Sequence, residues 1–109
     1  MYPIMSHYFR GDVILAPILI GRGRVRKVRP AAVLGSDTKG TLIVCPISCQ
    51  TPFNAMYVPL ALEDFASGGL EIFGESYLLV SERCSIRGEE VIGKKGKLRE
   101  EIIERISSR

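Results

Sequence analysis

Short apolar runs separated by clusters of turn residues make up the first three quarters of the chain. Runs of this kind, rich in Val, Ile and Leu and bounded by Gly, Pro, Asp or Ser, are typical of β-strands. We expect a first strand over 12–20 and a second over 28–35. The Gly/Arg segment between these two runs predicts that they form a hairpin.

The run at 41–48 is apolar at almost every position, which predicts a central strand buried on both faces. A shorter run at 56–60 contains Pro59, and this proline favours an edge strand or a strand end. Residues 61–69 fit a short irregular or helical connection. Residues 75–86 return to strand character, in a strand that can bend midway.

A helical pattern is present only in the tail. Its apolar residues fall on one stripe of an amphipathic helix that should pack on the sheet, and the stripe consists of Leu98, Ile102, Ile103 and Ile106. Roughly five or six short strands and one terminal helix predict a mainly β fold, a small SH3-like antiparallel barrel with a C-terminal α-helix. We see no internal repeat and expect residues 1–109 to form a single domain.

The composition is that of an ordinary globular domain, since 46% hydrophobic residues in a chain of 109 suffice to bury a core. The net charge of +3 is modest, so the distribution of charge is more informative than its sum. Basic residues concentrate at 22–29 and 94–99. The N-terminus lacks the apolar region of a signal peptide, and no run reaches the ~20 residues of a membrane helix. We therefore expect a soluble, cytoplasmic protein with no membrane contact.

The cysteines predict neither a metal site nor a catalytic thiol. Cys45, Cys49 and Cys84 lack the CxxC spacing of a zinc site or redox pair, and His7 is distant in sequence. Two of these cysteines lie in or beside apolar runs and are expected to be buried, reduced thiols. Asp12, at the start of the first strand, is expected to make a local turn hydrogen bond. We expect no metal and no cofactor.

Five basic side chains lie within eight positions of the first hairpin: Arg22, Arg24, Arg26, Lys27 and Arg29. Guanidinium groups match phosphate oxygens, and the nearby glycines would let the backbone approach a ligand, so this segment is a candidate surface for single-stranded nucleic acid. The alternative is a solvated loop whose charges keep the hairpin soluble. Arg29 differs from its neighbours because Pro30 and the following apolar strand would hold its guanidinium more rigidly.

Four motifs, taken with their order and spacing, resemble the MazF/PemK family of toxin ribonucleases: RGDVILAPI at 10–18, VRPAAVLG at 28–35, LIVCPIS at 42–48 and IGKKGKLREEIIERI at 92–106. The resemblance extends over nearly the whole chain. It implies an SH3-like barrel, usually a homodimer, that cleaves single-stranded RNA without metal and is silenced by a cognate antitoxin. It further implies that Arg29 is the phosphate-stabilising and acid arginine, and that the Ser48 hydroxyl contacts the same phosphate.

This chemistry has a physical rationale, because attack by a ribose 2′-hydroxyl needs a proton acceptor, donors around the phosphate and a proton source for the 5′-oxygen.

The chain departs from the family pattern at SERCSI, where Glu82 and Cys84 replace a Gln and an Arg found in many relatives. Glu82 could act as the base, Arg83 or Arg87 could replace the missing donor, or the site could be weakened or lost. The alternatives are an exposed strand-end pair for Glu82 and Arg83, and a turn hydroxyl for Ser48.

Phe53, in the loop after Ser48, is the aromatic residue best placed to stack on a base. The leading hypothesis is therefore a metal-independent endoribonuclease toxin, in which Arg29 is central and Ser48 and Glu82 assist. The second is an SH3-like RNA-binding module that lacks competent acid–base groups. The third is a gyrase poison of the same barrel type. That class usually depends on C-terminal residues, and the tail RISSR has no apolar or Trp terminus of the kind it uses.

Overall fold

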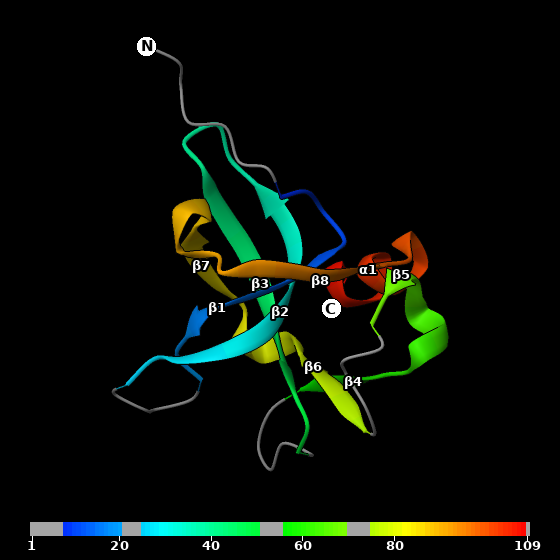
Figure 1. The fold of residues 1–109 in the computed structure, drawn as a ribbon. Coiled ribbons are helices and arrows are strands. Elements are labelled where there is room, and N and C mark those ends of the chain that lie inside the picture. The colour runs from blue at the N-terminus through cyan, green and yellow to red at the C-terminus, as the bar shows by residue number, and fades with distance from the viewer. Residues whose placement is uncertain (1–7, 21–24, 51–55, 70–74, 109) are drawn as a thin grey trace.

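The computed structural model describes residues 8–20, 25–50, 56–69 and 75–108, and these form one strongly curled antiparallel sheet with a C-terminal helix (Figure 1). The strands are β1 (Asp12–Ile18), β2 (Lys27–Ser36), β3 (Thr41–Ser48), β4 (Tyr57–Leu60), β5 (Phe65–Gly68), β6 (Ser76–Leu79), β7 (Cys84–Arg87) and β8 (Gly93–Leu98). The helices are α1 (Glu100–Ser107) and three short 3-10 helices, η1 (Leu62–Asp64), η2 (Val80–Glu82) and η3 (Gly88–Glu90). The predicted fold, a mainly β SH3-like barrel with a C-terminal helix, is confirmed.

The strand order is β4-β6-β3-β2-β1-β8-β5, with β7 paired to β3 beside this path. β1 and β2 form the predicted hairpin, in which Val13 pairs with Ala32 and Ile18 with Lys27. The prediction of a central third strand is confirmed, because β3 pairs with β2 along one side and with β7 and then β6 along the other. The bend predicted within 75–86 is η2, which separates β6 from β7. β3 therefore joins the two halves of the sheet.

Strands β5 and β8 are the elements that the sequence pattern does not predict. Residues 61–69 contain the short helix η1, as expected, but 65–68 form a strand that pairs with β8. The basic segment at 94–99 lies mostly in β8, which pairs with β1 on its other side. Leu98 accordingly ends a strand and does not begin the helix. Because Gly and Lys are weak strand formers, β8 depends on its pairing partners more than on local propensity.

Glycines allow β5 and β8 to approach each other closely. Gly68 and Gly96 are paired in the register of the two strands. A Cβ atom on Gly96 would lie 2.7 Å from the carbonyl oxygen of Ser67, and one on Gly68 would lie 2.5 Å from that of Lys95. Gly68 also has a φ of +69°, which favours glycine. The pairing of these strands therefore requires a residue without a side chain at both positions.

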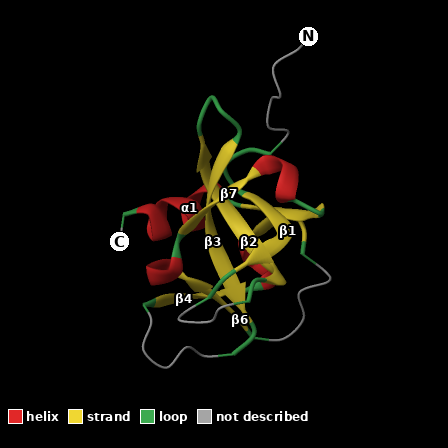
Figure 2. Ribbon diagram, turned by 90° about the vertical axis from the view of Figure 1, so that its left-hand side faces the viewer, coloured by secondary structure: helices red, strands yellow, loops and turns green. Residues whose placement is uncertain are grey.

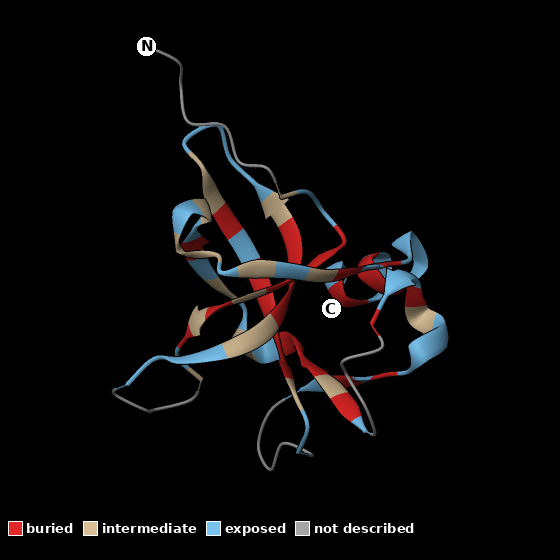
Figure 3. Cartoon of the chain, in the orientation of Figure 1, coloured by how far each residue is buried: buried red, intermediate tan, exposed pale blue. Residues whose placement is uncertain are grey.

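The core consists of two apolar clusters on opposite faces of the sheet. Figure 3 shows the buried residues, in red, along the strands and in α1. Successive residues of a strand alternate between them, so that Cys45 belongs to the first cluster and Val44 to the second. In α1, Ile102, Ile103 and Ile106 are buried in the first cluster, so the helix covers that face (Figure 2). None of the described helices is long and apolar enough to cross a membrane.

Candidate active site

Arg29 and Ser48 lie on the same face of the sheet. Ala31 of β2 pairs with Pro46 of β3, and Arg29 and Ser48 each stand two residues beyond this pair. Side chains two residues apart on a strand point to the same face. Ala31 and Val44 on this face belong to the second core cluster. We call the face that carries Arg29, Ala31, Val44, Pro46 and Ser48 the Arg29 face.

Glu82 lies in the connection between β6 and β7. It is the last residue of η2, which follows the strand paired with the end of β3. Burial raises the pKa of the Cys84 thiol, and the negative charge of Glu82 raises it further. Cys84 pairs with Val44 and packs against the second core cluster. Glu82 is thus close enough to Cys84 for its charge to act on the thiol, and its part in the candidate site stays a prediction.

The guanidinium of Arg29 is half-buried and has no partner among the described residues. Its Nε atom is buried and makes no hydrogen bond there. Five of the other described arginines have partners: Arg10 with Glu100, Arg26 with Glu90, Arg83 with the Val80 carbonyl, Arg87 with Glu89 and Arg99 with the Glu63 carbonyl. A partly desolvated cation without a counter-charge favours the binding of an anion such as a phosphate group.

The hydroxyl of Ser48 takes part in a local turn at the end of β3. The backbone N–H of Gln50 donates to Ser48 Oγ, and Oγ donates to the Gln50 carbonyl, both at 3.1 Å. This is the turn role that the sequence offered as the alternative for Ser48. Because the side chain is half-exposed, the hydroxyl can turn from the carbonyl to a phosphate oxygen while the Gln50 N–H continues to hold it.

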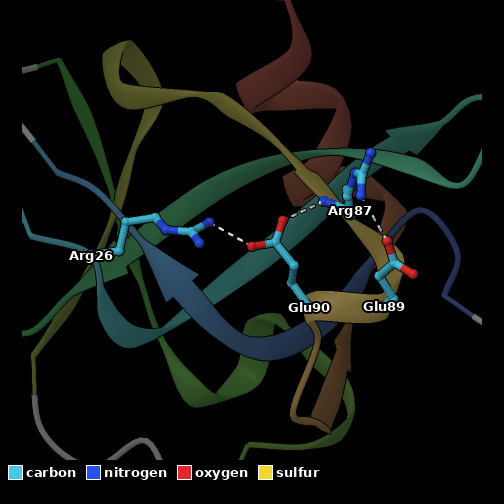
Figure 4. Close-up of polar contacts among 4 residues, drawn as sticks. All are labelled: Arg26, Arg87, Glu89 and Glu90. Atoms are coloured by element: carbon cyan, nitrogen blue, oxygen red, sulfur yellow. Dashed lines mark hydrogen bonds and ion pairs between the residues drawn. The ribbon is translucent and has the colours of Figure 1, made fainter.

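The predicted RNA-binding residues differ in their surroundings. Lys27 is exposed and lies two residues before Arg29, so it shares the Arg29 face. Arg26 instead pairs with Glu90 of η3, with 2.5 Å between Nη1 and Oε2 (Figure 4). The backbone N–H of Arg87, which donates to Glu90, and then the Arg26 guanidinium lower the pKa of the Glu90 carboxyl. The Arg26–Glu90 ion pair ties the start of β2 to η3.

Three of the predicted RNA-binding residues, Arg22, Arg24 and Phe53, lie outside the residues that the structure describes. Their roles stay predictions.

Arg87 lies away from the Arg29 face. Arg87 lies opposite Thr41, at the other end of β3 from Ser48, and its Nη1 is 3.2 Å from Glu89 Oε1. Arg83 donates from Nε to the Val80 carbonyl. Its charge acts on Cys45, which belongs to the cluster on the opposite face. Arg87 is therefore not placed to substitute for the donor that the family pattern has at residue 84, and that role for Arg83 stays a prediction.

The thiols of the central strands are protonated at neutral pH. Burial raises the pKa of Cys45 to about 12 and also raises that of Cys84. Since the thiolate is the nucleophilic form, neither cysteine is poised for nucleophilic chemistry. The expectation of a buried thiol is confirmed for Cys45, whereas Cys84 is half-buried and Cys49 is exposed.

Asp12 has the structural role that the sequence predicts. The Phe9 N–H donates to Asp12 Oδ2 at 2.8 Å, closing a local turn. On its other oxygen, Oδ1, the carboxylate has an ion pair with Lys94 Nζ at 3.0 Å, without the alignment of a hydrogen bond. This long-range contact joins β1 to β8 and gives no reason to assign Asp12 a part in the chemistry.

Tyr77 is a residue beside the site that sequence reasoning missed. It lies opposite Ser48 in the pairing of β3 with β6. In the sequence, Tyr77 stands beside Leu78 and Leu79 in the run at 75–86, and only the structure shows that it is half-exposed between the buried Ser76 and Leu78. The partner strand, however, is not visible in the local sequence.

The comparison with family models matches residues 9–109 to the PemK-like, MazF-like toxins of type II toxin–antitoxin systems. The match includes Arg29, Ser48 and Glu82 together with all the described strands and the helix. The search of curated proteins returned no match. Because the family model covers nearly the whole chain, from the turn before β1 to the end of α1, this protein belongs to the family of PemK-like, MazF-like toxins of type II toxin–antitoxin systems.

Proposed function

We propose that this toxin is a metal-independent endoribonuclease that cleaves single-stranded RNA and is neutralised by a cognate antitoxin protein. The observation that carries the proposal is the half-buried guanidinium of Arg29, which has no partner among the described residues and shares a face with Ser48. A phosphodiester is an anion that such a group would bind. Membership of the toxin family supports the same assignment.

In the proposed reaction the ribose 2′-oxygen attacks the adjacent phosphorus, and the carboxylate of Glu82 takes the hydroxyl proton. Arg29 and Ser48 donate hydrogen bonds to the phosphate oxygens, where negative charge develops in the transition state. The bond to the 5′-oxygen breaks, and Arg29, acting as the acid, gives this oxygen a proton. The products are a 2′,3′-cyclic phosphate and a 5′-hydroxyl, so one proton is taken up and one is released.

A second candidate is an RNA-binding module without catalysis. The observation that favours it is the engagement of the Ser48 hydroxyl by Gln50, together with the placement of Arg87 away from the Arg29 face. In that case the basic residues would hold the phosphates while no group moved a proton.

We further propose that the toxin acts as a homodimer. Large apolar side chains are exposed near the second half of β1, residues 15–18. Val28 lies next to one edge of this half and Ile92 next to the other, and Val25 precedes β2 on the Val28 side. Val28 pairs with Pro17, and the Ile92 N–H donates to the Leu15 carbonyl. Neighbouring exposed apolar residues of this kind are typical of a surface that a second copy covers.

Incubation of the purified protein with a long single-stranded RNA in EDTA, followed by mapping of the new ends, tests the proposal. We expect cleavage that leaves a 2′,3′-cyclic or 3′-phosphate, and none of the all-deoxy analogue, because the nucleophile belongs to the RNA. Cleavage that survived removal of the 2′-hydroxyl at the scissile nucleotide would refute this mechanism. Binding without any cleavage would favour the RNA-binding module.

A further inference from the structure

Two tyrosines on neighbouring strands form an aromatic pair beside the candidate active site. Tyr57 of β4 and Tyr77 of β6 meet edge to face, with ring centroids 5.2 Å apart and an interplanar angle of 90°. Tyr57 is 37% exposed and Tyr77 is half-buried. Their strand neighbours Val58 and Leu78 point the other way, into the first core cluster. The tyrosine pair therefore lies outside both core clusters and presents ring surface to solvent.

The tyrosine pair continues the Arg29 face across two more strands. Tyr77 lies opposite Ser48 in the β3–β6 pairing, and Pro59, two residues after Tyr57, lies opposite Tyr77. Side chains directly opposite each other on antiparallel strands have Cβ atoms about 5 Å apart. From β2 to β4, the face thus carries a guanidinium, then a hydroxyl, then two aromatic rings.

A polar contact at the tip of the ring restrains Tyr77. Its hydroxyl donates to Glu75 Oε2 at 2.8 Å, so the ring is held at both its edge and its tip. The carboxylate of Glu75 repels a phosphate group, whereas Arg29 at the other end of the face attracts one. The charges therefore favour a phosphate near Arg29 and an uncharged, planar group near the tyrosines.

We propose that Tyr57 and Tyr77 form a base-stacking subsite for single-stranded RNA, on the two strands that follow β3 in the sheet. The inference rests on the proposed function, since that function supplies RNA as the occupant. Unpaired bases stack on aromatic rings with little regard to sequence. With a base held on the tyrosine pair, the charges on this face favour a neighbouring phosphate on the side of Ser48 and Arg29.

Binding of an all-deoxy single strand of mixed sequence tests the subsite, because this strand has bases and phosphates but no 2′-hydroxyl nucleophile. We expect Tyr57→Ala to weaken binding roughly tenfold, as for the loss of one stacked base, and to leave the salt dependence unchanged. Tyr57→Phe keeps the ring and should bind within about twofold of the parent. An abasic strand of equal length should bind the parent and Tyr57→Ala equally.

Leu62→Ala, which shortens an exposed apolar side chain on η1, is the matched control, and thermal unfolding checks that each variant folds. If Tyr57→Ala does not fold, Tyr57→Leu keeps apolar bulk without an aromatic face and should show the same tenfold loss. Equal losses with normal and abasic strands, or a loss in Leu62→Ala as large as in Tyr57→Ala, would overturn the subsite.

The subsite and the catalytic proposal can fail separately. If the parent cleaves RNA while Tyr57→Ala binds the mixed-sequence strand as well as the parent does, the subsite is wrong and the proposed function stands. If binding depends on Tyr57 while the parent cuts no RNA, the proposed catalysis is wrong and the subsite stands.

Discussion

The backbone of Arg29 is restrained by its pairing with β1 and by the proline that follows it, while the described residues leave its charge uncompensated. Its backbone pairs with Ala16 of β1, and Pro30 fixes the next φ angle. The guanidinium therefore emerges from a restrained strand, and a group fixed in this way needs little reorganisation to stabilise a transition state. The paired Arg26, three residues earlier, would first have to leave Glu90.

If Arg29 acts on the transition state, Arg29→Ala should lower the single-turnover cleavage rate by roughly 100-fold or more, the cost of losing one preorganised donor. RNA binding should weaken much less. Single-turnover kinetics at saturating enzyme separate the two effects. Arg105→Ala, which removes an exposed charge from α1, should leave the rate near that of the parent. A variant at Arg29 that lost binding and kept the rate of the bound RNA would contradict the assignment.

Glu90 should make stability dependent on acid pH. Its pKa is lowered in the folded protein by the Arg87 N–H and by Arg26, so its contribution is present above the unfolded pKa and is lost as pH falls through the folded pKa. Glu90→Gln should therefore lower the Tm at pH 7, and the difference from the parent should shrink as pH falls below about 4 and vanish below the lowered pKa of the folded state. Thermal unfolding over this range is the measurement.

Glu89→Gln is the matched control for Glu90, because the Glu89–Arg87 pair is more exposed and should contribute little at any pH. A Tm difference for Glu90→Gln that stayed constant from neutral to acid pH would mean that its carboxylate charge is not what stabilises the fold.

At the scale of elements, the sequence predicts the strands whose apolar pattern is sufficient by itself. The run at 41–48 corresponds to β3 in both bounds, and the stripe of isoleucines corresponds to α1. The same approach misses β8, because a Gly- and Lys-rich segment has little strand propensity and pairs only where β1 and β5 are already in place.

The residues of the candidate site also divide into those that the sequence reveals and those that only the structure reveals. Arg29 is found because it precedes a strong apolar run, and Ser48 is found by its place in the family pattern. Tyr77 and the Arg26–Glu90 ion pair are missed because they depend on the register between strands and on contacts between residues that are distant in sequence. Glu82 is found by its place in the family pattern, and its position beside Cys84 could be known only once η2 was seen to interrupt the strand.

The close approach of β5 and β8 makes a prediction about stability. Gly96→Ala would place a methyl group 2.7 Å from the Ser67 carbonyl oxygen, so one of the strands must shift. We expect a loss of roughly 1–3 kcal/mol in the free energy of unfolding, the usual cost of forcing an extra methyl group into a packed site. Denaturant unfolding measures it.

Gly93→Ala lies on the same strand and meets no atom within 4 Å, so it should change stability far less. Equal effects of the two substitutions would show that the loss comes from the chain entropy of glycine and not from the contact between the strands.

At the scale of the whole molecule, β3 organises both the core and the site. Its pairing with β2 ends at Ala31 and Pro46, and beyond this point β2 and β3 carry Arg29 and Ser48 out of the shared ladder (Figure 1). The two clusters bury the opposite faces of the strands up to that point. The end of the ladder is therefore where polar and charged side chains of the Arg29 face can become accessible to a ligand.

A dimer that covers residues 15–18 of β1 would place a second copy close to the end of the β2–β3 ladder, where the Arg29 face is accessible. We expect light scattering at micromolar concentration to give twice the 12.1 kDa mass of the chain. Val28→Asp, which puts a charge among the exposed apolar residues, should shift the mass toward that of the monomer.

Leu62→Asp introduces the same charge at an equally exposed apolar residue, 55% exposed as Val28 is, but on η1, and it should leave the mass unchanged. A monomeric parent would contradict the dimer, and a dimer that tolerates Val28→Asp would move the interface to another surface.

If the dimer forms as expected, a loss of RNA cleavage in Val28→Asp at concentrations where it is monomeric would mean that the second copy completes the surface on which the RNA lies. Cleavage by the monomer at the parent rate would instead mean that each Arg29 face works alone.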